Sequence, residues 1–454
     1  MSAQAQVESP REGVFEFQGL RFHYLVWEPQ RQEAACSETA AGSAAASAPL
    51  VLLHGFAQSA WSWAQAAALL ARGRAVYALD LTGHGGSERP DSPKPYGLAA
   101  QGEALLAFLE SLADLERATD AAGGASGAGV AGVAGVVDVE CSADVLPIAS
   151  ADVLPIASAA SAGSETSGGF AALAGPAASV GPAASAGLAA PAGSAASATG
   201  TAGCGGTAFA TSAASAVPAA GAEGATPVAQ AVREASLPVV VGYSMGGRVA
   251  LSALVEAPEA FADCVGGLVL ESAGLGPATE EERARAARTD AARAAHVREA
   301  GVAAFMDEWE RLPLFASQER LSPEQRARVR QERLANDAEV LARTVEGAGQ
   351  HAMPSQEQTL AALEGLAAAG VPVLYLAGSL DAKYCAVAES LRAPIVPAPA
   401  APGRPDALDV HIVEGVGHNI HLEAPEAFCE VVAAFISSVA DGSSGMRGKS
   451  QVVG

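Results

Sequence analysis

The sequence predicts an α/β fold in which helices flank a mostly parallel central sheet. Six short apolar runs are rich in Val and Leu and end in Gly or polar residues, as strands buried on both faces of a parallel sheet do. Stretches of helical character alternate with these runs, which indicates βαβ units. A tight Gly-x-Ser-x-Gly turn also joins one run to the helix that follows it. In such a sheet, active-site groups gather beyond the carboxyl ends of the strands.

The predicted elements define a core and one segment outside it. Strands are expected at 50–56, 73–81, 237–244, 265–274, 371–378 and 409–418. Helices are expected at 61–71, 101–115, 246–256, 356–369 and 425–439. Residues 280–345 break the alternation because they form a long, helical and charged segment between two strands, and we expect them to cover the active site as a helical lid. The core then comprises residues 1–121, 231–279 and 346–440, followed by a flexible tail at 441–454.

A low-complexity insert is expected at residues 122–230. This segment consists mainly of Ala, Gly, Ser, Thr and Pro, and the octapeptide SADVLPIA at 142–149 repeats directly at 150–157. Such a composition buries too little apolar area to offset the entropy of ordering the backbone. We therefore expect this insert to be disordered, with an Ala-driven helix around 205–235 as the alternative.

Composition and charge exclude several classes of protein. The 454 residues include 50 acidic and 27 basic side chains, giving a net charge of −23, which argues against a nucleic-acid binder. We expect no signal peptide and no membrane span, because a basic start before an apolar stretch and a long run of bulky apolar residues are both missing. The six cysteines include no CxxC pair and give no zinc or disulfide pattern. We expect a cytoplasmic protein, and the oligomeric state stays open.

The motif that carries chemistry is Gly-Tyr-Ser-Met-Gly at residues 242–246. An apolar strand precedes it and a helix pattern follows it, which is the context of a nucleophile elbow in the α/β-hydrolase fold. The tight turn presents the hydroxyl of Ser244 at the strand end, and the glycines let strand and helix approach closely. The structural alternative is a buried strand–turn–helix junction with an idle serine. The motif and its context together favour an α/β-hydrolase fold with Ser244 as the reactive group.

A serine hydroxyl needs a neighbouring base, and in this fold the chain order is Ser, then Asp or Glu, then His. His418 directly follows the last predicted strand, and we prefer it to His421, which we expect near a helix start. Asp381 follows the penultimate strand and is the predicted acid, although it could also cap the next helix. The competing acids Asp406 and Asp409 precede a strand and so lie at its wrong end.

Two backbone amides complete the predicted site. In this fold, a loop after an early strand donates one N–H to an oxyanion hole, and the residue after the serine donates the other. We therefore assign the N–H groups of Phe56 and Met245 to this hole. His54 and His84 lie in the neighbouring loops, and we expect them to shape those loops rather than to act in catalysis.

Several stretches together resemble one family within the α/β hydrolases. They are GYSMGGRVAL at 242–251, LHGF at 53–56, DLTGHGGS at 80–87, DEWERLPLFAS at 307–317 and GHNIHLEAPEAF at 417–428. The chain resembles the 2-succinyl-6-hydroxy-2,4-cyclohexadiene-1-carboxylate synthase (SHCHC synthase, MenH) family of menaquinone biosynthesis over nearly all of its length outside the inserts. The resemblance implies a lyase that eliminates pyruvate from 2-succinyl-5-enolpyruvyl-6-hydroxy-3-cyclohexene-1-carboxylate. It also implies that Ser244, made basic by His418 and Asp381, removes a ring proton without an acyl-enzyme.

The resemblance also implies a set of residues that bind a small polycarboxylate substrate. The matching positions are Tyr243, Arg248, Trp309 and Arg333, with one further lid arginine that is either Arg285 or Arg288. Twelve arginines lie between residues 283 and 343, and arginine suits bidentate carboxylate recognition. The alternative is that most lid arginines form solvated pairs with interspersed acids, and that Trp309 belongs to the lid core.

Two departures from the family pattern concern residues near the site. Gly-Ser-Leu-Asp at 378–381 stands where the family often has Gly-Glu-Arg-Asp, and Thr82 stands where proline is common. The same triad would also suit a serine hydrolase, either a carboxylesterase or a C–C bond hydrolase, and this is the alternative enzyme function. An idle ligand-binding relative of the fold is the alternative from another class. No metal and no organic cofactor is implied.

Overall fold

The computed structural model describes residues 9–29, 48–121, 237–392 and 408–445. By their contacts, all of these described residues belong to one unit of the chain. The predicted insert at 122–230 lies outside the described residues. So does the predicted tail beyond residue 445.

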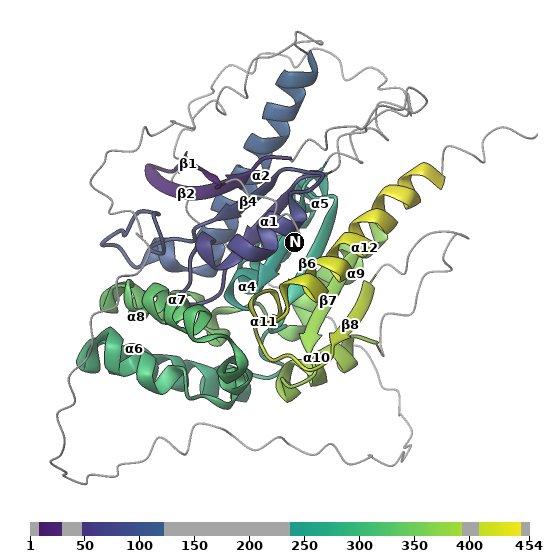
Figure 1. The fold of residues 1–454 in the computed structure, drawn as a ribbon. Coiled ribbons are helices and arrows are strands. Elements are labelled where there is room, and N and C mark those ends of the chain that lie inside the picture. Colours follow the sequence, from purple (N-terminus) through teal and green to yellow (C-terminus); the bar gives the residue numbers. More distant parts are fainter. Residues whose placement is uncertain (1–8, 30–47, 122–236, 393–407, 446–454) are drawn as a thin grey trace, which may run out of the picture. The chain divides into compact units, whose positions relative to one another are not determined.

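Eight strands among the described residues form one sheet in the order β1-β2-β4-β3-β5-β6-β7-β8 (Figure 1). Their bounds are β1 Arg11–Phe17, β2 Leu20–Trp27, β3 Leu50–Leu53, β4 Val76–Leu79, β5 Val239–Tyr243, β6 Gly267–Glu271, β7 Val373–Gly378 and β8 Leu408–Val413. The strands from β4 to β8 pair in parallel, and β1 and β2 are antiparallel. This confirms the predicted mostly parallel sheet and the α/β-hydrolase fold.

The first two strands were missed in the sequence analysis. β1 and β2 form a hairpin in which Phe15 pairs with Phe22, and Gln18 and Gly19 connect the strands with φ of 50° and 78°. Two consecutive positive φ angles are typical of the tight turn that matches the twist of a β-hairpin. The signal was present, because a glycine turn separates two segments with alternating apolar residues.

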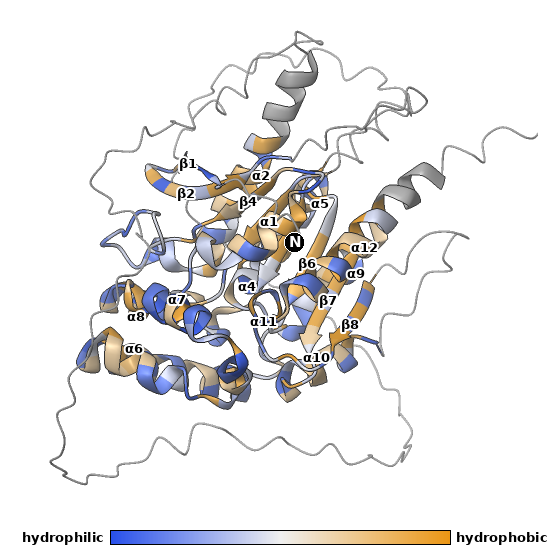
Figure 2. Ribbon diagram, in the orientation of Figure 1, coloured by the Kyte–Doolittle hydropathy of each residue, from blue (hydrophilic) through white to orange (hydrophobic). Residues whose placement is uncertain are grey.

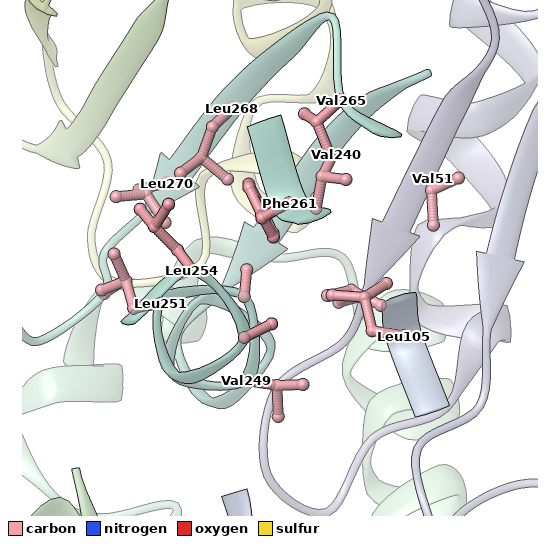
Figure 3. Packing of buried hydrophobic residues seen from close by; sticks show 14 of the residues in the cluster. Val51, Leu105, Val240, Val249, Leu251, Leu254, Phe261, Val265, Leu268 and Leu270 are labelled. Atoms are coloured by element: carbon pink, nitrogen blue, oxygen red, sulfur yellow. The ribbon is translucent and has the colours of Figure 1, made fainter. Parts of the chain in front are cut away.

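Helices cover both faces of the sheet and explain why the inner strands are apolar throughout. One face carries α1 (Ala64–Leu70), α11 (Ile420–Glu423) and α12 (Pro425–Gly445), and the other carries α2 (Leu98–Ala121), α4 (Met245–Glu256), α5 (Pro258–Cys264), α9 (Gln356–Ala368) and α10 (Ala382–Arg392). In β5, Val240 packs on the α4 side, whereas Val239 and Val241 pack on the α1 and α12 side. Figure 2 shows the strands largely in the apolar colour, and Figure 3 shows Val240 and Leu268 packed against Leu254 and Phe261.

The segment between β6 and α9 is helical and has a small core of its own. It contains α6 (Glu280–Trp309), η3 (Pro313–Arg320), α7 (Pro323–Leu334) and α8 (Ala338–Ala348), which we call the lid (Figure 1). Side chains cap its helices: Thr279 begins α6, Ser322 forms a capping box with Gln325 at α7, and Asp337 caps α8. These caps accept hydrogen bonds from amides that the helix itself cannot satisfy.

Three short 3-10 helices lie outside the lid, η1 (Ala60–Trp63), η2 (Lys94–Tyr96) and η4 (Gln350–Ala352). At the C-terminus, α12 continues past residue 440, where the core was expected to end, to Gly445. Within the described ranges, no helix combines the length and the hydropathy needed to cross a membrane.

Candidate active site

Ser244 sits in a strained turn between β5 and α4. Its φ and ψ are 50° and −100°, a region that residues other than glycine rarely adopt. The turn depends on close backbone approach: a Cβ on Gly242 would lie 2.6 Å from the Cα of Gly247, and one on Gly246 would collide with the carbonyl of Leu53. The two glycines of the motif therefore let α4 start directly under the strand ends, so that the serine side chain projects from the carboxyl edge of the sheet.

The structure brings Ser244, His418 and Asp381 into one hydrogen-bonded row. His418 Nε2 lies 3.0 Å from Ser244 Oγ, and His418 Nδ1 lies 2.8 Å from Asp381 Oδ2. His418 and Asp381 are buried, and Ser244 is partly exposed. With its proton on Nδ1, the ring donates to the carboxylate and leaves Nε2 free to accept the serine proton. The geometry is that of a serine activated by an oriented histidine.

Asp381 keeps its place although its neighbours depart from the family pattern. It follows β7 in a turn in which its own N–H donates to the Gly378 carbonyl at 2.9 Å. The side chain of Leu380 is exposed, and Ser379 Oγ accepts from the Gly415 N–H at 2.8 Å. Asp381 Oδ1 also accepts from the Tyr384 N–H at 3.3 Å, so the carboxylate also hydrogen-bonds an amide in the first turn of α10. The substituted residues thus point away from the carboxylate.

The alternatives to Asp381 and His418 do not join the row in the described structure. Asp406 is outside the described residues, and Asp409 is exposed on β8, where its carboxylate accepts from the adjacent Val410 N–H. His421 is fully buried, and its Nδ1 lies 2.7 Å from Glu271 Oε2. His421 therefore has a carboxylate partner of its own, separate from Asp381.

Glu271 connects the turn that carries Ser244 to the segment that carries His418. Its carboxylate accepts from the N–H groups of Ile420 at 2.6 Å and His421 at 3.1 Å, at the start of the helix that follows His418. Its backbone carbonyl accepts from the Ser244 N–H at 2.8 Å. One fully buried residue at the end of β6 therefore binds both the serine turn and the histidine loop. Glu271 carries no signal in the sequence that marks it as a site residue, because its partners are distant in the chain.

The two amides predicted to form an oxyanion hole belong to the serine turn and to the loop after β3. Met245 is the first residue of α4, where the N–H has no carbonyl partner within the helix. Phe56 lies in residues 54–60, which follow β3 and which we call the oxyanion loop. Within this loop, Ala57 adopts φ of 59°, and the Gly55 N–H donates to Gln58 Oε1 at 3.2 Å. A Cβ on Gly55 would collide with the ring of Tyr243, so the loop lies directly against the elbow.

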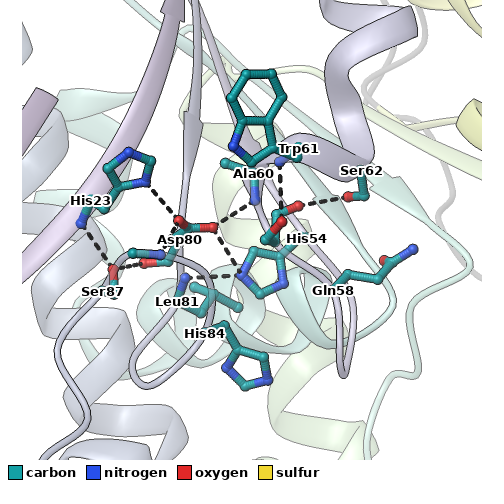
Figure 4. Close-up of polar contacts among 12 residues, drawn as sticks. His23, His54, Gln58, Ala60, Trp61, Ser62, Asp80, Leu81, His84 and Ser87 are labelled. Carbon is teal, nitrogen blue, oxygen red and sulfur yellow. Dashed lines mark hydrogen bonds and ion pairs between the residues drawn. The ribbon is translucent and has the colours of Figure 1, made fainter. Parts of the chain in front are cut away.

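A buried polar cluster supports the oxyanion loop from the sheet side (Figure 4). Asp80 accepts from the Ala60 N–H at 2.6 Å and pairs with His23 at 2.7 Å. Burial opposes the charge of Asp80, but His23 and His54 outweigh it and lower its pKa. Burial lowers the pKa of His54, whose Nε2 accepts from the Leu81 N–H, and lowers the pKa of His84 to about 3. His54 Nδ1 lies 2.7 Å from the Gly55 carbonyl, and His84 Nδ1 lies 3.0 Å from the Thr82 carbonyl.

Arg248 and Tyr243 are buried close to the row. The ring of Tyr243 lies 5.3 Å from that of His418, and burial raises the Tyr243 pKa well above its usual value. Arg248 Nη1 donates to the Ala348 carbonyl, and its buried Nε has no hydrogen-bond partner within the described structure. Burial lowers the Arg248 pKa, Tyr384 and Asp290 oppose this effect, and Arg293 adds a smaller contribution of the same sign as burial. Among the described residues no acid forms an ion pair with this buried guanidinium, which favours a bound anion.

Trp309 and Arg333 belong to an aromatic group between the lid and His418. Trp309 lies 5.1 Å from the ring of Phe56 and 5.9 Å from that of Phe315. Arg333 is 4 % exposed, lies 5.1 Å from the Phe315 ring, and pairs with Glu310 at 3.2 Å. Since Phe315 lies 5.9 Å from His418, both predicted residues are linked to the row through one ring.

Arg285 and Arg288 are exposed on the first half of α6. Arg285 pairs with Glu282 at 3.8 Å, and among the described contacts neither arginine touches the row. Another lid arginine, Arg293, lies 5.5 Å from the Trp309 ring and pairs with Asp290. The sequence analysis counted Arg293 among the twelve lid arginines but did not single it out.

Tyr384 was also missed. Its ring lies 4.8 Å from that of His418, and it follows Asp381 by three residues on α10. A helix start at Asp381 predicts this proximity, because residues three apart share one helix face. Among the described residues, no group of three or more His, Cys, Asp and Glu side chains is arranged to hold a metal ion.

Comparison with known proteins places this chain in a family. The model of the alpha/beta hydrolase family matches residues 201–431, and that of the alpha/beta hydrolase fold matches residues 48–130. This chain belongs to the alpha/beta hydrolase family. Within the family it is 34 % identical over 200 residues to a Bacillus subtilis (strain 168) protein that carries the provisional name 2-succinyl-6-hydroxy-2,4-cyclohexadiene-1-carboxylate synthase.

The other similar proteins include further MenH-like alpha/beta hydrolases. A Salmonella newport (strain SL254) protein named SHCHC synthase is 29 % identical over 197 residues, which cover 43 % of this chain and 67 % of that protein. The Bacillus match covers 44 % of this chain and 66 % of the relative, just under two thirds of its length. The structure of MenH from S. aureus matches with a TM-score of 0.55 at 18 % identity, covering 92 % of this chain and 98 % of that one. At this identity, the structural match supports the fold alone.

Proposed function

We propose that this protein is a carbon–oxygen lyase of menaquinone biosynthesis. It eliminates pyruvate from 2-succinyl-5-enolpyruvyl-6-hydroxy-3-cyclohexene-1-carboxylate and forms 2-succinyl-6-hydroxy-2,4-cyclohexadiene-1-carboxylate. The observation that carries this proposal is the row of Ser244, His418 and Asp381 next to buried arginines and aromatic rings. Similarity to proteins named SHCHC synthase supports this substrate over others.

The row acts as a general base in this reaction. Ser244 Oγ removes a proton from the substrate ring while His418 Nε2 takes the serine proton, and Asp381 holds the ring in the required tautomer and stabilises its positive charge. The electrons of the broken C–H bond form a new ring double bond, the existing ring double bond shifts by one position, and the C–O bond to the enolpyruvyl group breaks. His418 then gives its extra proton to the leaving enolpyruvate, which becomes pyruvate. No acyl-enzyme forms.

Charge recognition and charge stabilisation come from different groups. Arg248 and Arg333 bind substrate carboxylates, Tyr243 and Trp309 contact the substrate, and these contacts position the ring above Ser244. The buried, unpaired Nε of Arg248 supports an anionic ligand, because a carboxylate would satisfy it. The N–H groups of Phe56 and Met245 stabilise the negative charge that develops as the proton leaves.

The alternative function is a serine hydrolase that uses the same row. The strained φ of Ser244 favours it, because this elbow also presents a nucleophile for attack on an ester. The two functions differ in their products: the lyase releases pyruvate, whereas the hydrolase cleaves simple esters through a covalent intermediate.

A coupled assay separates these functions. Purified protein receives the enolpyruvyl substrate, made enzymatically, and pyruvate release is followed for the wild type and for Ser244→Ala. We expect the substitution to lower the rate roughly 10²–10⁴-fold, the usual value of general-base catalysis. Ser272→Ala is the matched control, since Ser272 is likewise a serine with a positive φ at the end of a neighbouring strand, but it is fully buried. Pyruvate release at the spontaneous rate, together with Ser244-dependent ester cleavage, would instead establish the hydrolase.

A further inference from the structure

The oxyanion loop packs into the lid core rather than only into the sheet core. Ala57 is fully buried and belongs to a cluster whose other members all come from the lid. These members are Ala294, Val297, Phe305, Met306, Leu341 and Ala342. The neighbouring Phe56 ring lies 5.1 Å from Trp309 and 6.4 Å from Phe305. Phe56, which carries the predicted oxyanion amide, and the next residue, Ala57, therefore both contact lid side chains.

Two polar side chains at the end of α7 bind the same loop. Glu332 Oε1 accepts from the Ser59 N–H at 2.7 Å and from the Ser59 hydroxyl at 2.6 Å. One turn further on, Asn336 Nδ2 donates to the Ala57 carbonyl at 3.1 Å. All three bonds reach from the lid to loop residues that follow Phe56.

The loop needs such support because its conformation is unfavourable by itself. Ala57 has φ of 59°, and a non-glycine residue in this region costs on the order of 1–3 kcal/mol, so it persists only where its surroundings hold it there. On the sheet side, Asp80 holds the loop at Ala60, which lies beyond the strained residue (Figure 4). The lid therefore supplies the contacts that hold the middle of the loop.

We propose that Glu332 is a positioning residue that holds the oxyanion loop against the lid and thereby aims the Phe56 N–H at the reacting group. This inference rests on the proposed function, because it assigns Phe56 to the oxyanion hole. Glu332 itself does not touch the substrate: it acts through Ser59, with Asn336 as a second support. A consequence is that the oxyanion hole is complete only while α7 lies on the loop.

The pKa of Glu332 is consistent with a carboxyl group that is buried between α7 and the oxyanion loop. Burial raises its pKa from 4.5 to about 7, against the opposing effect of the hydrogen bonds from Ser59. The charged groups that act on it are Asp80, below the loop, and Arg333, on its own helix. Its Oε1 accepts the Ser59 bonds whether or not Oε2 carries a proton, so a glutamine can replace the acid in this contact.

Kinetics test this role with four variants. We expect Glu332→Ala to lower kcat roughly 10–100-fold with KM changed less than about threefold, because loss of a whole oxyanion donor typically costs 10²–10³ in kcat. Glu332→Gln should restore kcat to within about threefold of the wild type, because it keeps the acceptor. Glu319→Ala, at an exposed lid glutamate, serves as the matched control. Asn336→Ala should have a smaller effect in the same direction and replaces Glu332→Ala if that variant does not fold.

Hydrogen exchange tests the positioning itself and does not depend on the reaction. We expect amides of residues 54–60 to exchange roughly tenfold faster in Glu332→Ala than in Glu319→Ala, because the loop opens locally when its lid contact is lost. Unchanged exchange, or a kcat of Glu332→Ala within twofold of the wild type, would overturn the inference. A wild type without Ser244-dependent pyruvate release would count against the proposed function, and the exchange result would still decide the role of Glu332.

Discussion

Two glutamates bind active-site backbone in this protein, and they come from different parts of it. Glu271 lies at the end of β6 and holds the serine turn and the start of α11 through bonds that stay within the sheet core. Glu332 lies on α7 and holds the oxyanion loop from the lid. Glu271 is fully buried, whereas Glu332 is only partly buried.

This difference separates the row, which the sheet holds, from the oxyanion loop, which also needs contacts from the lid. The row of Ser244, His418 and Asp381 lies at strand ends that pair with one another, so its backbone is held mainly by the sheet. The oxyanion loop depends on a helical segment that leaves the sheet and returns. Substitutions on the sheet side should therefore cost folding stability, and those on the lid side should mainly cost turnover or substrate affinity.

The largest effect on stability is expected for Glu271→Leu. The substitution leaves the N–H groups of Ile420 and His421 without an acceptor and removes the partner of the His421 ring. Removing one partner of a buried pair typically costs about 3–5 kcal/mol of the free energy of unfolding. Urea unfolding followed by circular dichroism measures it, with Glu414→Leu, at an exposed residue after β8, as the control. A loss no larger than that of the control would mean that the sheet core does not depend on Glu271.

A smaller, pH-dependent effect is expected for Glu332→Gln. The pKa of this carboxyl is about 7 in the folded protein against 4.5 ordinarily, so the folded state binds a proton more tightly than the unfolded state between these values. Stability of the wild type should therefore fall as pH rises from about 4.5 to 7, by at most about 3 kcal/mol. Unfolding at pH 5 and pH 8 measures the change, and the fall should be smaller in Glu332→Gln. A fall of the same size as in Glu319→Gln would contradict the raised pKa.

The smallest expected effects distinguish the lid arginines. Arg293 lies 5.5 Å from the Trp309 ring, so its guanidinium offers a cation to a substrate carboxylate held near that ring, although Asp290 already pairs with it. We expect Arg293→Ala to raise KM roughly tenfold, which corresponds to about 1.4 kcal/mol. Arg285→Ala should leave KM within about twofold, because that side chain is 66 % exposed and pairs with Glu282. Steady-state assays measure both KM values. A larger rise in KM for Arg285→Ala than for Arg293→Ala would indicate that Arg285 binds the substrate.

Sequence reasoning predicted the sheet better than the lid. Apolar runs and glycines reflect local requirements of buried parallel strands and of the tight turn at Ser244, so the fold and the position of the serine follow from short stretches. The hairpin of β1 and β2 was missed because no crossover helix marks it. Chain order indicated Asp381 and His418 as partners for Ser244, and their roles stay predictions.

The contacts between distant segments could not be predicted in this way. Glu271 lies about 150 positions before His421, and Glu332 lies still further from Ser59. No local pattern in the sequence pairs such residues. Nor could the arginine count in the lid say which of them would face Trp309, because that depends on how α6 is rotated about its axis and on its break at Gly301, where φ is 77°.

The two edges of the sheet differ in how freely they can change. The chain enters its longest undescribed segment after Ala121 of α2 and returns before Val239, at the amino end of β5, whereas Ser244 leaves the opposite end of the same strand. A length change at that entry point therefore shifts no residue of the row. The position after Ala121 is therefore suited to protein engineering. A fluorescent reporter or an affinity tag inserted there should leave the row at the opposite edge of the sheet unchanged.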